Sequence, residues 1–162
     1  MRITDINPRY QPLQDMCFQT ALKIAFDELC KSFEEVPKLS INKISKLSKY
    51  DRGVRDLDYA YAQLNKYLNE RHYKFCERSG IDVEMSLIDK ILSDGNASVP
   101  IVTVGASWLS EMYGNINLDE IPENDEHELI VLDLNQTDII VYDTYAPFRR
   151  SYCYDWYRRI SI

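Results

Sequence analysis

The chain has 162 residues, the size of one ordinary domain, and folding at this length buries roughly 70% of the surface that the unfolded chain exposes. Apolar residues make up 45% and charged residues 28%, with 5 glycines and 6 prolines, which excludes collagen-like, low-complexity and intrinsically disordered chains. The formal net charge of −7 disfavours the broad basic surface that nucleic-acid binders need.

The first part of the chain predicts an extended segment followed by a long helix. Pro8 and Pro12 both oppose helix formation, so residues 1–16 are expected to be extended. A helix is expected to begin about Cys17, with Asp15 just before it as a cap. Apolar residues at steps of three and four define its buried stripe, namely Phe18, Ala21, Leu22, Ala25 and Leu29.

Three further helices follow in the sequence. The pattern predicts a short helix from about Ser40, a strong helix over residues 55–70, and another that ends near Asp94. Their inner faces are marked by Ile41, Ile44 and Leu47, by Leu57, Tyr61, Leu64 and Leu68, and by Met85, Ile88, Ile91 and Leu92.

The last part of the chain is rich in strands. Residues 99–104, 127–134 and 137–143 are apolar and β-branched, and each is expected to be a strand covered on at least one face. The tail over residues 151–162 predicts one or two more strands. We therefore expect an α+β fold in which an N-terminal helical part packs on a C-terminal antiparallel sheet.

The sequence lacks the patterns of a membrane span, a signal peptide and a zinc site, and this indicates the kind of protein and its location in the cell. No stretch approaches the roughly 18 apolar residues of a membrane span, and the N-terminus has no signal-peptide pattern. The four cysteines form no CxxC pair, which argues against a zinc site. We expect one cytoplasmic domain over residues 1–162 with reduced thiols, no cofactor, no metal, no bound nucleic acid and no membrane insertion. The sequence leaves the oligomeric state open.

Cys17 is the cysteine best placed for chemistry. It stands where an extended segment becomes a helix, and there the unpaired amides and the helix dipole favour a thiolate nucleophile. The alternative is a small buried hydrophobic residue at a helix end. The other cysteines, Cys30, Cys76 and Cys153, lack this argument and are assigned to core or surface positions.

A thiolate nucleophile needs a general base, and the chain has two histidines. His72 lies at the predicted end of a helix, where an exposed histidine is common. His127 opens a predicted strand after an acidic loop, a place where a scaffold can hold a site residue and leave it accessible. His127 is therefore the candidate base.

The hairpin over residues 127–143 supplies a candidate partner for His127. If Asn135 is the centre of the turn, His127 lies directly opposite Asp143, and a carboxylate there can fix the imidazole tautomer. The same register places Leu129, Val131, Ile139 and Val141 on the face of the site, and Ile130, Leu132, Ile140 and Tyr142 on the other face. A two-residue turn would shift the pairing by one and move Asp143 to the wrong face.

Acyl transfer also needs a donor for the developing oxyanion. A side-chain amide ahead of the nucleophile could share that role with the Cys17 backbone N–H. Gln11 and Gln14 both precede Cys17, and Gln11 is the preferred candidate.

The order Gln11, Cys17 at a helix start, His127 at a strand start and Asp143 at the end of the next strand resembles the papain-like cysteine peptidases. The closer likeness is to the double-glycine leader-peptidase branch, and it lies in QPLQDMCFQTALKIAF and HELIVLDLNQTDIIVYD. The resemblance implies a papain-like fold with Cys17 as nucleophile, His127 as general base and acid, Asp143 as orienting residue and Gln11 as oxyanion donor. The chain departs from the family at Phe18, where many relatives have glycine; this predicts narrower access to the thiol. It departs again at Thr144, where many have proline.

The first functional hypothesis is therefore a cysteine hydrolase, a peptidase that cleaves an extended peptide through an acyl-enzyme. An amidase or acyltransferase would use the same triad with a different acyl acceptor. The alternative from another class is a non-catalytic module that binds a protein partner through some of its 12 tyrosines.

Overall fold

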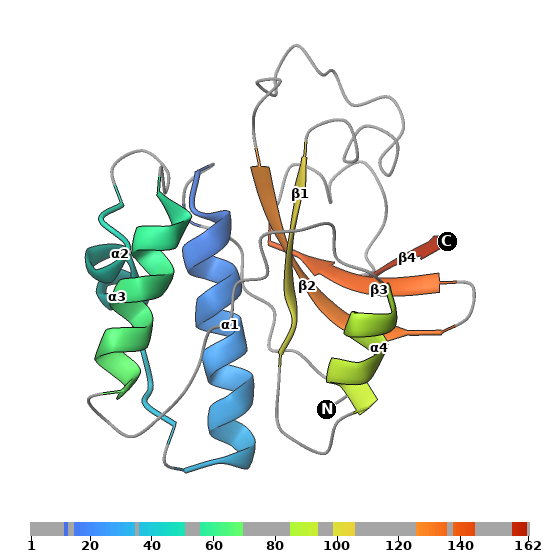
Figure 1. Ribbon diagram of the computed structural model, residues 1–162, viewed down its shortest axis with the longest axis horizontal. Helices are drawn as coiled ribbons and strands as arrows, with labels where there is room; N and C mark the ends of the chain where they lie inside the picture. The colour runs from blue at the N-terminus through green and yellow to red at the C-terminus, as the bar shows by residue number, and fades with distance from the viewer. Residues whose placement is uncertain are drawn as a thin grey trace.

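The computed structural model describes a chain in which helices come first and strands last (Figure 1). The helices are α1 (Cys17–Ser32), α2 (Ile41–Leu47), α3 (Leu57–Asn69) and α4 (Met85–Ser93), and the strands are β1 (Ile101–Gly105), β2 (Glu126–Leu134), β3 (Asp138–Asp143) and β4 (Tyr157–Ser161). The described residues are 12, 15–34, 36–50, 56–69, 85–93, 99–105, 126–135, 138–144 and 157–161. The structure is a mixed α+β arrangement, as expected.

Helix α1 is buried on two sides because its sequence carries two apolar stripes. Phe18, Leu22 and Phe26 pack against α2 and α3, whereas Ala21 and Ile24 pack against the sheet. The helix therefore lies between the α2–α3 pair and the sheet (Figure 1). This central position fixes the place of its first residue, Cys17, relative to the strands.

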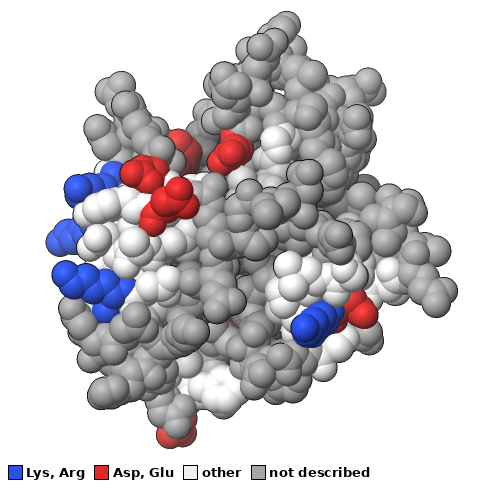
Figure 2. All heavy atoms as spheres, viewed as in Figure 1, with Lys and Arg blue, Asp and Glu red and all other residues white. Residues whose placement is uncertain are grey.

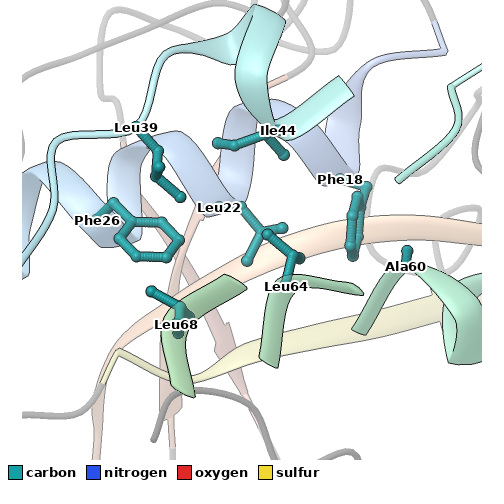
Figure 3. Close-up of a cluster of buried hydrophobic side chains, with 8 residues drawn as sticks. All are labelled: Phe18, Leu22, Phe26, Leu39, Ile44, Ala60, Leu64 and Leu68. Atoms are coloured by element: carbon teal, nitrogen blue, oxygen red, sulfur yellow. The ribbon is translucent and has the colours of Figure 1, made fainter. Parts of the chain in front are cut away.

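The cluster between the three N-terminal helices is the larger of the two that involve α1 (Figure 3). Phe18 is 3% exposed and meets the ring of Tyr61 edge to face, with the ring centroids 5.5 Å apart. Its side chain thus fills the helical core beside Ala60 and anchors the start of α1. That Phe18 narrows access to the Cys17 thiol stays a prediction.

Helix α2 begins at a side-chain cap. The Oγ of Ser40 accepts a hydrogen bond from the backbone N–H of Lys43 at 3.2 Å. The same N–H also bonds the Ser40 carbonyl at 3.0 Å, so the hydroxyl is a second acceptor for an amide at the helix start.

Replacement of Ser40 by alanine is expected to lower the free energy of unfolding by about 1 kcal/mol, since the Lys43 amide loses its side-chain acceptor and keeps only the residue-40 carbonyl, at 3.0 Å. Urea denaturation of the variant measures the loss. Asn42→Ala, at an exposed position of the same helix, is the matched control and should change stability by less than about 0.5 kcal/mol. Equal losses in the two variants would contradict a capping role.

The four described strands form one antiparallel sheet in the order β1-β2-β3-β4. Strand β2 is central to the site, and Val104 of β1 lies opposite its His127. Between β2 and β3 the register shifts after Val131, so that Leu129 lies opposite Asp143 and Leu134 lies opposite Ile139. This irregularity is a β-bulge, which increases local twist and redirects side chains.

Both faces of the β2–β3 hairpin are covered by helices. Ile130, Leu132 and Tyr142 pack with the α1 residues Ala21 and Ile24. The opposite face packs against α4 through Leu129, Val131, Leu134, Ile139 and Val141, which contact Ile88 and Leu92. The predicted division of the hairpin residues between two faces is confirmed. A strand buried on both faces explains the nearly continuous apolar run in HELIVLDL.

Charged residues of both signs occupy the face drawn in Figure 2. Lysine side chains gather over α2 and α3, and acidic side chains lie next to them. The described part of this face is therefore not uniformly basic. Among the described helices, none combines the length and the apolar character needed to span a membrane.

Candidate active site

Cys17 lies at the first residue of α1, and its thiol is free and partly exposed. The residue before it, Met16, is the N-cap, and its side chain makes no capping hydrogen bond. The first turn of α1 also carries no acidic residue. Unpaired amides and the positive end of the helix dipole therefore meet at the position of the thiol, an arrangement that favours negative charge there.

His127 is the second residue of β2, and it is buried, with 7% of its surface exposed. A hydrogen bond to strand β3 holds its ring: Nε2 lies 2.7 Å from Oδ1 of Asp143. Asp143 is the last residue of β3 and is 5% exposed. The predicted contact between the histidine and the aspartate is present.

The register that produces this contact differs from the predicted one. Asp143 lies opposite Leu129, two residues along the strand from His127, so the two side chains meet on the diagonal. A shift of two residues keeps both side chains on one face of the sheet. The prediction that His127 lies directly opposite Asp143 is wrong, and the reason is the longer turn together with the bulge after Val131.

The Cys17 side chain is the second partner of the His127 ring. Cys17 acts on the ring through a side-chain hydrogen bond and through charge, and both effects raise the pKa of His127. The ring therefore has two partners, the Asp143 carboxylate at Nε2 and the Cys17 thiol.

These neighbours decide the charge of the ring. Burial alone would lower the pKa of His127, because a charged imidazolium is poorly solvated there. The charge and the hydrogen bond of Asp143, together with the hydrogen bond and charge of Cys17, outweigh burial and raise the pKa of His127 from 6.5 to about 10. The ring is therefore an imidazolium at neutral pH, and an imidazolium beside a thiol stabilises the thiolate.

The remaining site predictions divide into those that the structure describes and those that it does not. Gln11, Gln14, His72, Cys76 and Cys153 lie outside the described residues, so the oxyanion donor stays a prediction. Cys30 is free, and its thiol donates a hydrogen bond to the Val36 carbonyl oxygen at 3.2 Å. Burial, followed by the charge of Asp27, raises the pKa of the Cys30 thiol, which opposes a nucleophilic role.

Three buried polar residues that the sequence analysis did not select lie close in the sequence to Cys17 or His127. Gln19 and Thr20, in the first turn of α1, are fully buried, and their side-chain polar atoms have no hydrogen-bond partner among the described residues. Glu128, next to His127, is buried, and its carboxylate accepts a hydrogen bond from Thr103 Oγ1 at 2.9 Å. A polar residue inside an apolar stripe was the available signal in each case.

The described residues contain no group of three or more His, Cys, Asp or Glu that could hold a metal ion. The candidate site consists of the Cys17 thiol, the His127 imidazole and the Asp143 carboxylate, with the imidazole as the partner of both other groups.

Comparison with known proteins adds no identity. No family model, no curated protein and no solved structure matches the chain.

Proposed function

We propose that the chain is a papain-like cysteine hydrolase, and that its substrate is an extended peptide. The observation that carries the proposal is the position of the His127 ring, which bonds Asp143 through Nε2 at 2.7 Å and also bonds the Cys17 side chain. A buried imidazolium with a thiol on one side and a carboxylate on the other is the arrangement that activates a thiolate nucleophile.

Each residue has one role in the proposed reaction. The Cys17 thiolate attacks the carbonyl carbon of the substrate, a C–S bond forms, and the π pair of the carbonyl moves onto its oxygen as an oxyanion, which re-forms the carbonyl when the C–N bond breaks. The His127 imidazolium then gives its proton to the leaving amine as the C–N bond breaks, which leaves a thioester on Cys17. Neutral His127 next removes a proton from water, and the resulting hydroxide attacks the thioester. This step releases the carboxylic acid and restores the Cys17 thiolate and the His127 imidazolium.

Two further groups support this sequence of steps. Asp143 holds the ring orientation and stabilises its positive charge through the buried hydrogen bond. The uncapped amides at the start of α1 supply hydrogen-bond donors where an oxyanion on the attacked carbonyl would form. Gln11 is the proposed side-chain donor at the same place.

The order of the elements also supports the proposal. The nucleophile stands at the start of a long helix, the base at the start of a strand and the orienting carboxylate at the end of the next strand. The helix and the strand lie close enough for the two side chains to bond. The chemistry therefore comes from segments that are more than 100 residues apart in the sequence.

The proposal is tested by incubating the protein with a mixed peptide library and identifying new peptide ends by mass spectrometry. Cys17→Ala is expected to reduce cleavage by about 10³-fold or more, since the nucleophile is lost. Cys30→Ala removes the other described thiol and should leave cleavage unchanged. An acid-quenched sample of the wild type should carry an acyl group on Cys17, and its transfer to water or to an added amine identifies the acyl acceptor.

A protein that cleaves equally well as Cys17→Ala would overturn the proposal. If no peptide is cleaved, no acyl group appears and Cys17 reacts like an ordinary thiol, a non-catalytic binding role takes its place.

A further inference from the structure

A hydrogen bond ties the residues before Cys17 to a distant turn of the helical part. The hydroxyl of Tyr50 donates to Oδ1 of Asp15 at 2.6 Å, and the two residues are 35 positions apart. Asp15 stands two residues before Cys17. Tyr50 follows α2, so the bond joins the end of α2 to the segment that leads into α1.

This bond takes Asp15 away from the role that its position favours. An aspartate just before a helix is expected to accept hydrogen bonds from the first amides, which complements the positive end of the helix. The N-cap of α1 is Met16 instead, and its side chain makes no capping hydrogen bond. The prediction that Asp15 caps α1 is wrong, because the Tyr50 hydroxyl binds the carboxylate.

Several contacts hold the turn that carries Tyr50. Lys49 has a left-handed backbone conformation, with φ at 49°. Such a conformation costs a non-glycine residue about 1–2 kcal/mol. The Tyr50 N–H reaches back to the Ser45 carbonyl at 3.0 Å, and the Lys49 ammonium lies 4.1 Å from the centre of the Tyr59 ring. These contacts hold the turn, and with it Tyr50, in one place.

The bond between Tyr50 and Asp15 affects which charges lie close to Cys17. His127 and Asp143 face the thiol from the sheet as a paired cation and anion. Asp15 lies two residues before Cys17, and the first turn of α1 itself carries no acidic residue. A carboxylate that turned onto those amides would compete with the thiolate for the same donors and the same dipole.

We propose that Tyr50 is a positioning residue for Cys17: its bond to Asp15 holds that carboxylate off the first turn of α1 and so reserves the helix start for the thiolate. This inference rests on the proposed function, since it concerns how the same nucleophile is kept reactive. Tyr50 itself touches neither substrate nor reacting atoms.

The test measures the rate of Cys17 alkylation by iodoacetamide between pH 5 and pH 9, with the modified cysteine identified by peptide mass spectrometry. Tyr50→Phe keeps the ring and removes the hydroxyl, and it should reduce the rate at pH 6 by about two- to five-fold. The pH profile should move to higher pH as well. Tyr59→Phe, which removes a neighbouring hydroxyl and keeps the ring beneath Lys49, is the matched control and should leave the profile in place.

Asp15→Asn shows whether the effect passes through the carboxylate. In that background, Tyr50→Phe should change the rate by less than about 1.5-fold, because no charge is left to be released. A two- to five-fold loss in both backgrounds would overturn the inference, as would a fall in thermal stability without any movement of the pH profile.

A further arm keeps the inference testable if Tyr50→Phe fails to fold. Asp15→Asn alone should react at least as fast as the wild type at pH 6, since it removes the competing charge. A slower reaction would mean that the carboxylate assists the thiol and would overturn the inference. Failure of the proposed function is recognised separately, by a wild-type Cys17 whose rate does not depend on His127.

Discussion

Replacement of His127 by alanine is expected to slow alkylation of Cys17 at pH 6 by roughly 30- to 100-fold. The pKa of His127 is raised to about 10, so the ring is an imidazolium at pH 6 and stabilises the thiolate beside it. An ordinary thiol has a pKa near ~8.5 and is only about 0.3% ionised at pH 6. A stabilised thiolate is also a weaker nucleophile, so the fall in rate is smaller than the fall in the amount of thiolate.

The measurement compares the rates for Cys17 and Cys30 in the same sample by peptide mass spectrometry. Cys30 reports on general accessibility, and its rate should not change, because its hydrogen bond is to the Val36 carbonyl. His72→Ala removes the other histidine and should leave the Cys17 rate at its wild-type value. A Cys17 rate that is the same with and without His127 would show that no thiolate–imidazolium pair exists.

The helices were the part of the fold that the sequence predicted best. Residues 55–70 were expected as a helix and α3 runs from Leu57 to Asn69, while the helix expected from about Cys17 begins at Cys17. Both have apolar residues at regular steps of three and four, a signal that lies within one segment. The strand predicted in the tail is also present as β4.

The hairpin shows why a site contact was predicted although its register was not. Alternation of apolar residues assigns each side chain to a face, and an even shift of register preserves that assignment. His127 and Asp143 therefore share a face whether they are opposite or diagonal neighbours. The turn length and the bulge after Val131, which set the register, leave no periodic signal in the sequence.

Asp15 illustrates the limit of local reasoning more sharply. Its position before a helix predicts a cap, and nothing nearby in the sequence contradicts that prediction. The partner that captures its carboxylate, Tyr50, comes from 35 residues away and depends on a left-handed Lys49. A contact of this kind is decided by the packing of α1, α2 and α3 against one another, which periodicity does not encode.

Asp143 is expected to matter for stability as much as for chemistry. Asp143→Ala should lower the free energy of unfolding at pH 6 by about 3–5 kcal/mol, since it leaves the buried His127 without its carboxylate partner. Asp143→Asn removes the charge but keeps a hydrogen-bond acceptor, so it should cost less. Urea denaturation at pH 6 measures both losses. Asp89→Asn, at an exposed position of α4, is the control for loss of an aspartate charge.

The pH dependence distinguishes the charge of the pair from simple packing. The pKa of His127 is raised on folding from 6.5 to about 10, so the native state binds the proton more tightly than the unfolded chain does. The resulting stabilisation is complete below about pH 6.5 and is lost as the pH rises through about 10. The wild type and Asp89→Asn should therefore be more stable at pH 6 than at pH 9.5, and Asp143→Asn should lose most of that difference. Repeating the comparison in a Cys17→Ala background removes the titration of the thiol. A difference of the same size in Asp143→Asn as in the wild type would mean that the carboxylate does not hold the proton on His127.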